Sequence, residues 1–410
     1  MTTVLHHVEL CVKNGRKVLG NFIQNFGFRL HARRTTEFVE QKVVRSGQSV
    51  FVINEILQKG ELNFRENKRI DDDWTILCCH ETDTVFNVAL HVKDVGKTTE
   101  RARAIGAHVV REPCDVQDRW GHVTYSIVKS CCGNVLHTLI NKDNYLGPFL
   151  PGFEMMEDSA EQNSSGVTHV DHVTYVCRPG ESHSILNWYE QVFGMKRFLM
   201  NREENMKEGL ILDGQVGMRL KAMEYWRCAE VGLSSAPSTQ PENPGANSGQ
   251  SLIFVLAESL FGQENSHVET FLHEHGSPGV QHIGLTTSNM LETVAYMANK
   301  GVMFRKPPGA YYRQPDKIQQ IHAVGQDLKV LQHLGILLDS EADPAVETRY
   351  ASGHRYLMQI FTLPLFDRET FFLEVLQRHG ARGFGAGNVM ALARSVEEEK
   401  SKMLTDKQNI

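Results

Sequence analysis

Four stretches of this chain look alike: HHVELCVKNGRK (6–17), FNVALHVKDVGK (86–97), VDHVTYVCRPGE (170–181) and VQHIGLTTSNML (280–291). Each begins with alternating apolar and polar residues, which is typical of a strand with one buried face. Each then breaks at Gly, Asn or Asp and enters a helical pattern that ends near a glycine-containing turn. After the turn the chain returns to a strand-like pattern. The repeat therefore predicts four βαβββ units, each a strand, a helix and then three strands.

One such unit cannot bury its apolar surface alone, so we expect the four units to pair into two similar domains. The expected fold is α+β, with curved mixed sheets of the vicinal-oxygen-chelate type and helices outside them. The expected boundaries are an N-terminal domain over 1–153, a linker over 154–166, a C-terminal domain over 167–396 and a charged tail over 397–410. Two other polar segments, 232–250 and 340–353, are expected to be surface loops.

Composition and charge narrow the possible partners. The chain has 410 residues, a net charge of −6 and no basic block, so nucleic acid is not an expected partner. No apolar run approaches the roughly 18 residues that a membrane span needs. The N-terminus reads directly into a strand without a hydrophobic signal core, which favours a soluble intracellular protein. None of the eight cysteines forms a C-x-x-C pair, so we expect free thiols.

Two histidines and one glutamate form a candidate metal centre. His172 and His282 occupy the same place in the first strands of the third and fourth units, and Glu374 lies inside the apolar strand TFFLEVLQR (370–378). An unpaired carboxylate would be costly to bury in such a strand. Imidazole and carboxylate ligands without a thiolate suit Fe(II) and leave coordination positions open, with zinc as the alternative. We therefore expect one Fe(II) per chain.

The N-terminal half supplies an internal comparison. Its equivalent positions hold His7, Asn87 and, less directly, His137. Asn87 is a poor iron ligand, so the set is incomplete. We predict that this half is structural and binds no second metal.

Six stretches carry a likeness to known proteins: NYLGPFLPGF (144–153), VDHVTY (170–175), GVQHIGL (279–285), LMQIFT (357–362), TFFLEVLQRHG (370–380) and GFGAGN (383–388). They resemble the 4-hydroxyphenylpyruvate dioxygenase family of the vicinal-oxygen-chelate superfamily. RSGQSVFVINE (45–55), LAESL (256–260) and PPGAYYRQP (307–315) are similar to a dioxygenase-like branch of that family. The resemblance implies that His172, His282 and Glu374 hold the Fe(II).

The resemblance implies further site residues. Gln281 and Gln359 match glutamines that line the substrate cavity, Phe361, Phe372 and Phe384 match aromatic wall residues, and Asn388 matches an asparagine near a lid helix. Ordinary core packing is the alternative for each of them. Other positions depart from the ring-hydroxylating members. Leu220 replaces a serine, Ala257 an asparagine and His267 a glutamine, while Val389 and Ala393 replace aromatic residues.

The resemblance also implies the reaction. An aromatic 2-keto acid and O2 react with loss of CO2, and attack on the ring gives homogentisate whereas attack on the benzylic carbon gives 4-hydroxymandelate. Val389 is smaller than phenylalanine and would let the substrate ring shift away from the metal, as in hydroxymandelate synthases. We therefore predict conversion of 4-hydroxyphenylpyruvate to 4-hydroxymandelate, with homogentisate formation as the alternative.

Two other functional classes stay open from the sequence. Leu220 and Ala257 favour a non-catalytic binding paralogue, because they remove hydrogen-bonding groups from the phenol end of the site. Extradiol ring cleavage uses similar ligands, but the GFGAGN stretch argues against it. The resemblance further implies a mitochondrial location and supply of the ubiquinone head group, and a homodimer is one expected assembly.

Overall fold

The structure is a computed structural model, and it describes residues 3–57, 80–156, 165–200, 204–212, 216–225, 252–262, 267–341 and 355–408. The expected surface loop over 232–250 and almost all of the one over 340–353 lie outside these residues. The five cysteines among the described residues are free thiols, as predicted. No helix of the described residues is long and apolar enough to cross a membrane.

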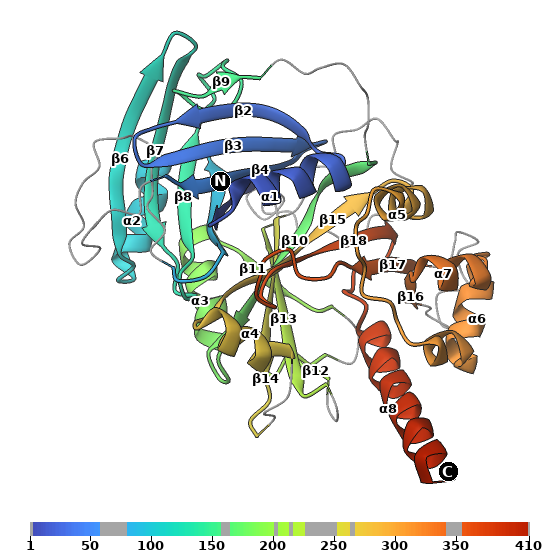
Figure 1. The fold of residues 1–410 in the computed structure, drawn as a ribbon. Helices are drawn as coiled ribbons and strands as arrows, with labels where there is room; N and C mark the ends of the chain where they lie inside the picture. Colours follow the sequence, from blue (N-terminus) through green and yellow to red (C-terminus); the bar gives the residue numbers. More distant parts are fainter. Residues whose placement is uncertain are drawn as a thin grey trace.

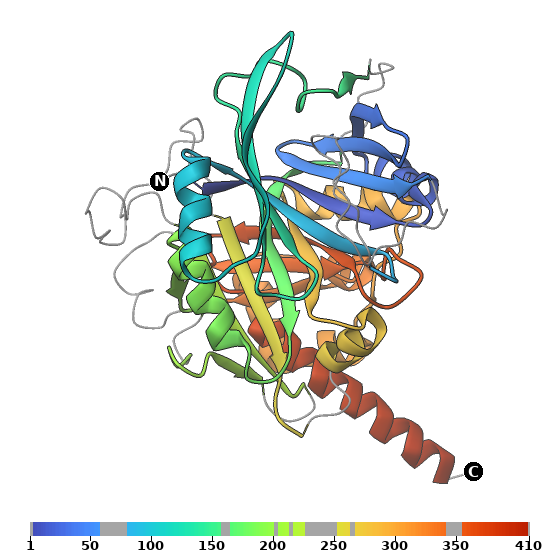
Figure 2. The same cartoon turned by 90° about the vertical axis from the view of Figure 1, so that its left-hand side faces the viewer.

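Two nine-stranded sheets form the body of the molecule (Figure 1). The first has the strand order β6-β7-β8-β5-β1-β4-β3-β2-β9. Its strands are β1 Thr3–Val12, β2 Arg29–Thr35, β3 Val39–Ser46, β4 Ser49–Ile56, β5 Thr84–Val92, β6 Val109–Asp118, β7 Gly121–Lys129, β8 Leu136–Asn141 and β9 Glu154–Met155. The β6–β7 hairpin projects well beyond the rest of this sheet (Figure 2).

The second sheet has the order β11-β13-β14-β10-β15-β18-β17-β16, with β12 beside β13. Its strands are β10 Val167–Cys177, β11 Lys196–Phe198, β12 Leu210–Leu212, β13 Met218–Tyr225, β14 Leu252–Ser259, β15 Gly279–Thr287, β16 Leu337–Ser340, β17 Tyr356–Phe361 and β18 Phe372–His379. The helices are α1 Gly15–Gly20, η1 Asn21–Asn25, α2 Val95–Ala104, α3 Ser182–Phe193, α4 His267–His275, α5 Met290–Asn299, η3 Gly309–Arg313, α6 Pro315–Ala323, α7 Leu328–Leu334 and α8 Ala386–Gln408.

The two sheets share one pairing scheme. In the first sheet β1 and β5 run antiparallel at the centre, and each has a parallel neighbour, β4 or β8. In the second sheet β10 and β15 take the central places, with β14 and β18 as the parallel neighbours. Each sheet thus combines two units in which a helix follows the first strand. The predicted α+β fold of four units is confirmed.

The residues at which the repeated stretches break begin the helices. The side chains of Asn14, Asp94 and Asn289 accept hydrogen bonds from the backbone N–H groups of Lys17, Lys97 and Glu292. These contacts satisfy backbone donors that a first helical turn leaves free. Helix α3 ends at Gly194, whose φ of 72° is favourable for glycine. Side-chain capping therefore explains where the helix begins in three of the four units.

The sheets meet across one continuous apolar core. Val8 and Leu10 of β1 belong to the same buried cluster as Val173 and Tyr175 of β10. Each sheet therefore turns one face, its core face, toward the common core. The opposite faces carry separate, smaller clusters. We call the opposite face of the second sheet the site face, because His172, His282 and Glu374 lie on it.

Helix α8 docks at the edge of the second sheet beside β16 and extends away from the body (Figure 1). Asn388 is fully buried, and its Oδ1 accepts hydrogen bonds from the Tyr311 hydroxyl at 2.7 Å and Lys317 Nζ at 3.1 Å. The ammonium of Lys317 also contacts Asp339 at 3.2 Å. The helix runs without a break to Gln408, where a separate tail over 397–410 was expected. The domain limits 1–153 and 167–396 stay a proposal.

Candidate metal centre

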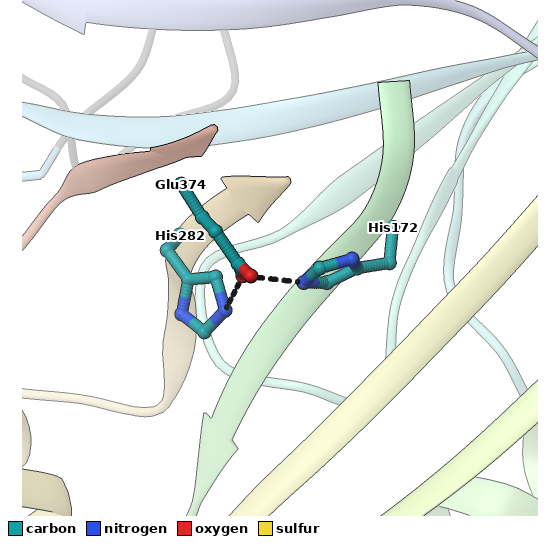
Figure 3. Close-up of side chains that lie close together, drawn as sticks. All are labelled: His172, His282 and Glu374. Carbon is teal, nitrogen blue, oxygen red and sulfur yellow. Dashed lines mark ion pairs between the residues drawn. The ribbon is translucent and has the colours of Figure 1, made fainter. Parts of the chain in front are cut away.

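Three side chains converge on one point of the second sheet (Figure 3). An Oε2 atom of Glu374 lies 3.2 Å from His172 Nε2 and 3.6 Å from His282 Nε2. The ligand atoms of all three residues lie within 4.8 Å of one another. Two ligand atoms that are each about 2.1 Å from a metal, at right angles, lie roughly 3 Å apart. The observed separations therefore suit three ligands on one side of a single metal ion.

The strand register explains this convergence. Gly284 of β15 pairs with His172 of β10 on one side and with Glu374 of β18 on the other. A Cβ atom at Gly284 would lie 2.3 Å from Cε1 of His172, so only glycine leaves room for the imidazole. The pairing of β10 with β15 shifts register before His172 and again after Thr174. The first shift leaves Asp171 as an extra residue on β10, and the second leaves Gln281 as an extra residue on β15. Such bulges often direct side chains near functional sites.

His172 is held from behind by a carboxylate. Asp171 Oδ1 lies 2.8 Å from His172 Nδ1, and the guanidinium of Arg378 contacts both carboxylate oxygens of Asp171 at 2.7 and 2.8 Å. Burial alone would lower the pKa of His172, but hydrogen bonds with Asp171 and Glu374 raise it to about 9. The surrounding carboxylates thus favour a positive charge at this point. A carboxylate behind a histidine ligand also fixes which ring nitrogen faces a metal.

Arg378 joins this centre to the segment that leads into α8. Its guanidinium donates hydrogen bonds to the backbone carbonyls of Ala381 and Gly383 and lies 4.9 Å from the centre of the Phe384 ring. The Phe384 ring in turn packs edge-on against His172, with ring centres 4.9 Å apart. The Arg378 guanidinium that binds the Asp171 carboxylate therefore also holds the segment that leads into α8.

Aromatic rings shield both imidazoles. Phe372 stacks on His282 with ring centres 4.7 Å apart, and Phe361 lies edge-on to Phe372. Gln281 Oε1 lies 3.3 Å from Nδ1 of His282. The structure therefore brings these three predicted site residues, together with Phe384, into the surroundings of the metal ligands. Apolar cover of this kind limits the access of water to a charged centre.

Two buried polar groups near the centre lack partners. Gln359 is fully buried on β17, and neither its Oε1 nor its Nε2 has a hydrogen-bond partner among the described residues. The hydroxyl of Thr174, two residues beyond His172 on β10, is also buried without a partner in the described chain. Buried polar groups are normally satisfied, so these two are candidates for contact with water or with a polar ligand.

The remaining predicted residues lie at the edges. Val389 belongs to an apolar cluster with Leu220, Val255 and Phe384. Leu220 pairs directly with Ala257 across β13 and β14, so both substituted positions are neighbours. Asn388 anchors α8 to Tyr311 and Lys317, as described above. His267 begins helix α4 with its side chain exposed, outside the buried group around the triad.

Known proteins resemble this chain over nearly its whole length. Residues 169–319 match the profile of the Glyoxalase/Bleomycin resistance protein/Dioxygenase superfamily. The chain is 35% identical over 403 residues to the 4-hydroxyphenylpyruvate dioxygenase-like protein of Homo sapiens, covering 97% of each chain. The chain belongs to the 4-hydroxyphenylpyruvate dioxygenase family.

Other relatives cover nearly the same length. The 4-hydroxyphenylpyruvate dioxygenase of Neurospora crassa is 30% identical over 415 residues, covering 97% of this chain and 91% of that protein. A triple mutant of 4-hydroxymandelate synthase from Streptomyces coelicolor has a similar structure, with a TM-score of 0.70 and 23% identity. The likeness covers 97% of this chain and 99% of that chain. Because the identity is 23%, the likeness to this solved structure supports the fold alone.

The first sheet contains the same positions with different residues. Glu9 pairs with Asn87 there, as Thr174 pairs with His282 in the second sheet. The parallel register of β5 and β8 places Thr138 opposite Ala89, where Glu374 lies opposite Gly284. His7, Asn87 and Thr138 are thus the counterparts of the three ligands.

The predicted equivalence of His137 is wrong, because the side chain of His137 points to the core face of the first sheet. Its Nε2 lies 2.8 Å from the Tyr189 hydroxyl of α3, and burial lowers its pKa to about 4. Adjacent strand residues point to opposite faces, so the correct counterpart of Glu374 is the next residue, Thr138.

A network of hydrogen-bonded side chains around Glu9 occupies the corresponding positions of the first sheet. The carboxylate of Glu9 accepts hydrogen bonds from Asn87 Nδ2 at 2.6 Å and Asn54 Nδ2 at 3.1 Å, and it lies 3.3 Å from His7 Nε2. The ring of Phe149 packs on His7 with centres 5.1 Å apart, and the neighbouring cavity has room for about one water molecule. The described residues contain one group with metal-ligand geometry, and it is the triad of the second sheet.

Sequence reasoning missed Asp171, Arg378 and Thr174. Asp171 and Thr174 flank the motif histidine, and Arg378 follows Glu374 by four residues in the same strand. Asp171 directly precedes His172 in the sequence, and this position could have identified it as a partner of the histidine. The contact between Arg378 and Asp171 depends on the pairing of distant strands, which no local pattern of this chain reveals.

We expect the triad to bind one Fe(II) per chain. Glu374→Gln should remove most of the metal, because an amide is a poor substitute for a carboxylate ligand. Iron is measured after anaerobic loading and desalting, with His7→Ala as the matched control that should retain a full equivalent. Two equivalents per chain that both persist in His172→Ala would contradict the assignment.

Asp171→Asn should weaken Fe(II) binding by about 10-fold or more while leaving the fold intact, because the charge that orients His172 is lost. Metal affinity is measured by competition with a chelator. The exposed Asp143→Asn serves as the control for a lost surface charge. Equal affinity in Asp171→Asn and the unaltered protein would show that this contact does not support the metal ligand.

Glu9→Ala should destabilise the protein by about 2 kcal/mol, because it removes the buried carboxylate that accepts hydrogen bonds from Asn87 and Asn54. Urea unfolding followed by fluorescence measures the change. Glu154→Ala, which removes an exposed carboxylate of β9, should have little effect. The metal content should stay at one equivalent, and unchanged stability of Glu9→Ala would refute the structural role of the network.

Proposed function

We propose that this protein is an Fe(II)-dependent dioxygenase that converts 4-hydroxyphenylpyruvate and O2 into 4-hydroxymandelate and CO2. The observation that carries the proposal is the buried triad of His172, His282 and Glu374 beside unpaired polar groups. A two-histidine, one-carboxylate set leaves several coordination positions open, as expected for an iron oxygenase. Membership of the 4-hydroxyphenylpyruvate dioxygenase family supports the same class of substrate.

The reaction balances without an added reductant. One oxygen atom of O2 enters the new carboxylate formed when the 2-keto acid loses CO2, and the other becomes the benzylic hydroxyl. Loss of CO2 supplies the two electrons that hydroxylation needs. When bound by the triad, Fe(II) would supply the activation of O2 and the attraction for the keto-acid oxygens.

The residues of the chain bind and orient the substrate in this proposal. Gln359 offers both a donor and an acceptor from a fully buried position. Phe372 and Phe384 cover the two imidazoles and restrict water near the ligands. Arg378 and Asn388 hold the two ends of the segment that leads into α8. Exclusion of water protects a reactive centre from side reactions.

The choice of product rests on the apolar cluster around Val389. Leu220 and Val389 belong to this cluster, and Ala257 lies directly beside Leu220. These side chains offer the substrate phenol no hydrogen bond and no aromatic ring to press against. The ring is therefore free to shift, and a shift of about an ångström or two decides whether the benzylic carbon or a ring carbon reacts. This reasoning favours 4-hydroxymandelate over homogentisate.

Homogentisate formation and a non-catalytic binding role are the alternatives. The binding role has the apolar phenol end in its favour, but it gives no reason for Glu374 to be buried between two imidazoles. A mitochondrial location, supply of the ubiquinone head group and a homodimer are parts of the proposal that rest on the resemblance of the sequence alone.

We expect the Fe(II)-loaded protein to consume O2 with 4-hydroxyphenylpyruvate and to yield mainly 4-hydroxymandelate, identified by mass spectrometry and chromatography. Val389→Phe should shift the product ratio toward homogentisate or uncoupled 4-hydroxyphenylacetate by about tenfold, because a contact of this size contributes roughly 1–3 kcal/mol. Iron content should be unchanged. Val330→Phe, a substitution at an exposed position of α7, is the control.

If the unaltered protein formed mainly homogentisate, the role of Val389 in product choice would be wrong. The assignment of the metal ligands would not be affected. Absence of keto-acid-dependent O2 uptake in a protein that retains its iron would favour the binding role instead.

A further inference from the structure

Lys317 is a buried cation next to the start of α8. Its exposed fraction is 1%, and it belongs to α6, which packs against β16 as α8 does (Figure 1). Its ammonium lies within hydrogen-bonding distance of four oxygen atoms, on Gln320, Leu338, Asp339 and Asn388, at 3.0 to 3.2 Å. A buried charge is tolerated only with such partners. This one side chain therefore connects α6, β16 and α8 at a single point.

Asp339 extends this connection to the backbone of α8. Its Oδ2 accepts a hydrogen bond from the backbone N–H of Gly387 at 3.0 Å, while its Oδ1 faces Lys317. A Cβ atom at Gly387 would overlap Asp339 Oδ1, so glycine is what lets the carboxylate approach the helix this closely. A carboxylate here satisfies an N–H group that a first helical turn leaves free. The pair of Lys317 and Asp339 therefore holds two consecutive residues of α8, Gly387 and Asn388.

The later turns of α8 have other contacts. The side-chain amide of Gln314 donates hydrogen bonds to the carbonyl of Ala391 and to Ser395 Oγ, both at 2.8 Å. Arg394 pairs with Asp316 of α6 at 3.1 Å, and both of these side chains are more than half exposed. Exposed ion pairs contribute little to stability. Removal of the Lys317 contacts would therefore free the first turn of α8 while Gln314 still holds the rest of the helix.

The first turn of α8 borders the metal centre. Phe384, just before the helix, packs edge-on against the metal ligand His172 with ring centres 4.9 Å apart. Val389, just after the two residues that Lys317 and its carboxylate hold, belongs to the apolar cluster with Leu220 and Phe384. A displacement of this turn would therefore move the side chains that cover the site on both sides of it.

We infer that Lys317 is a positioning residue that, through Asp339 and Asn388, holds the first turn of α8 in place beside the substrate. The inference rests on the proposed function for its substrate, a 2-keto acid. A buried ion pair is a costly way to gain stability, because apolar side chains of similar size often stabilise a protein as much. This pair instead selects one position of α8. If the turn left that position for part of the time, the apparent affinity for the substrate would fall by the fraction of molecules that stay competent to bind.

Lys317→Met tests the inference, because methionine is similar in length to lysine and removes the ammonium. Oxygen consumption by the Fe(II)-loaded protein gives KM and kcat for 4-hydroxyphenylpyruvate. We expect KM to rise by about tenfold and kcat to stay within about threefold, because saturating substrate restores the competent position of the turn. Hydrogen exchange of the amides of Gly387 and Val389 should be faster by about tenfold, since exchange reports local opening. The iron content should not change.

A second variant separates position from stability. Lys317→Met alone leaves the carboxylate of Asp339 without its cation, which destabilises a buried pair. The double variant Lys317→Met/Asp339→Asn removes both charges and keeps an oxygen atom for the N–H of Gly387. It should unfold at nearly the temperature of the unaltered protein and still show the raised KM. Asp316→Asn is the matched control, because it removes the exposed charged contact between the same two helices and should change neither KM nor amide exchange.

An unchanged KM in the double variant would overturn the inference while the proposed function stands, because Lys317 would then act on stability alone. A raised KM with unchanged amide exchange would overturn it too, since the effect would not pass through α8. Loss of iron from the double variant would show that Lys317 supports the metal instead. If the unaltered Fe(II) protein consumed no O2 with the keto acid, the proposed function itself would be wrong, together with the substrate assigned to this position.

Discussion

The burial of Glu374 is the constraint on which the site depends. A carboxylate inside a sheet loses its hydration, and it is tolerated only where other groups supply compensating charge or hydrogen bonds. Two imidazoles provide that compensation, with Nε2 atoms at 3.2 and 3.6 Å. Gly284, the only residue type that leaves room for the ring of His172, makes the approach possible. A metal ion bound at this point would satisfy all three side chains together.

The first sheet meets the same constraint in another way. Its buried carboxylate, Glu9, is satisfied by amide donors of Asn54 and Asn87, and the segment after β8 covers it with Phe149. Lys142 holds that segment through the carbonyl of Phe149, much as Arg378 holds the carbonyl of Gly383. One architecture therefore holds two buried carboxylates, Glu9 among amide donors in the first sheet and Glu374 beside two imidazoles in the second.

The sequence predicted the fold because the information is local and repeated four times. Alternation, helix caps such as Asp94 and glycine turns recur at matching places, and equivalent positions then identify His172 and His282. The register of paired strands was not predictable in this way. A shift of one residue changes which face a side chain takes, and the choice between His137 and Thr138 depends on the pairing of β5 with β8. The contact between Asp171 and Arg378, 207 residues apart, likewise depends on tertiary pairing.

The central claim is that the second sheet binds one metal ion through His172, His282 and Glu374, whereas the matching positions of the first sheet belong to the network around Glu9 and bind none. Anomalous diffraction at the iron absorption edge tests it directly, on crystals grown anaerobically with Fe(II) and 4-hydroxyphenylpyruvate. The account predicts one iron peak, bounded by His172, His282 and Glu374. An iron peak beside His7 and Asn87, or none at the triad, would contradict it.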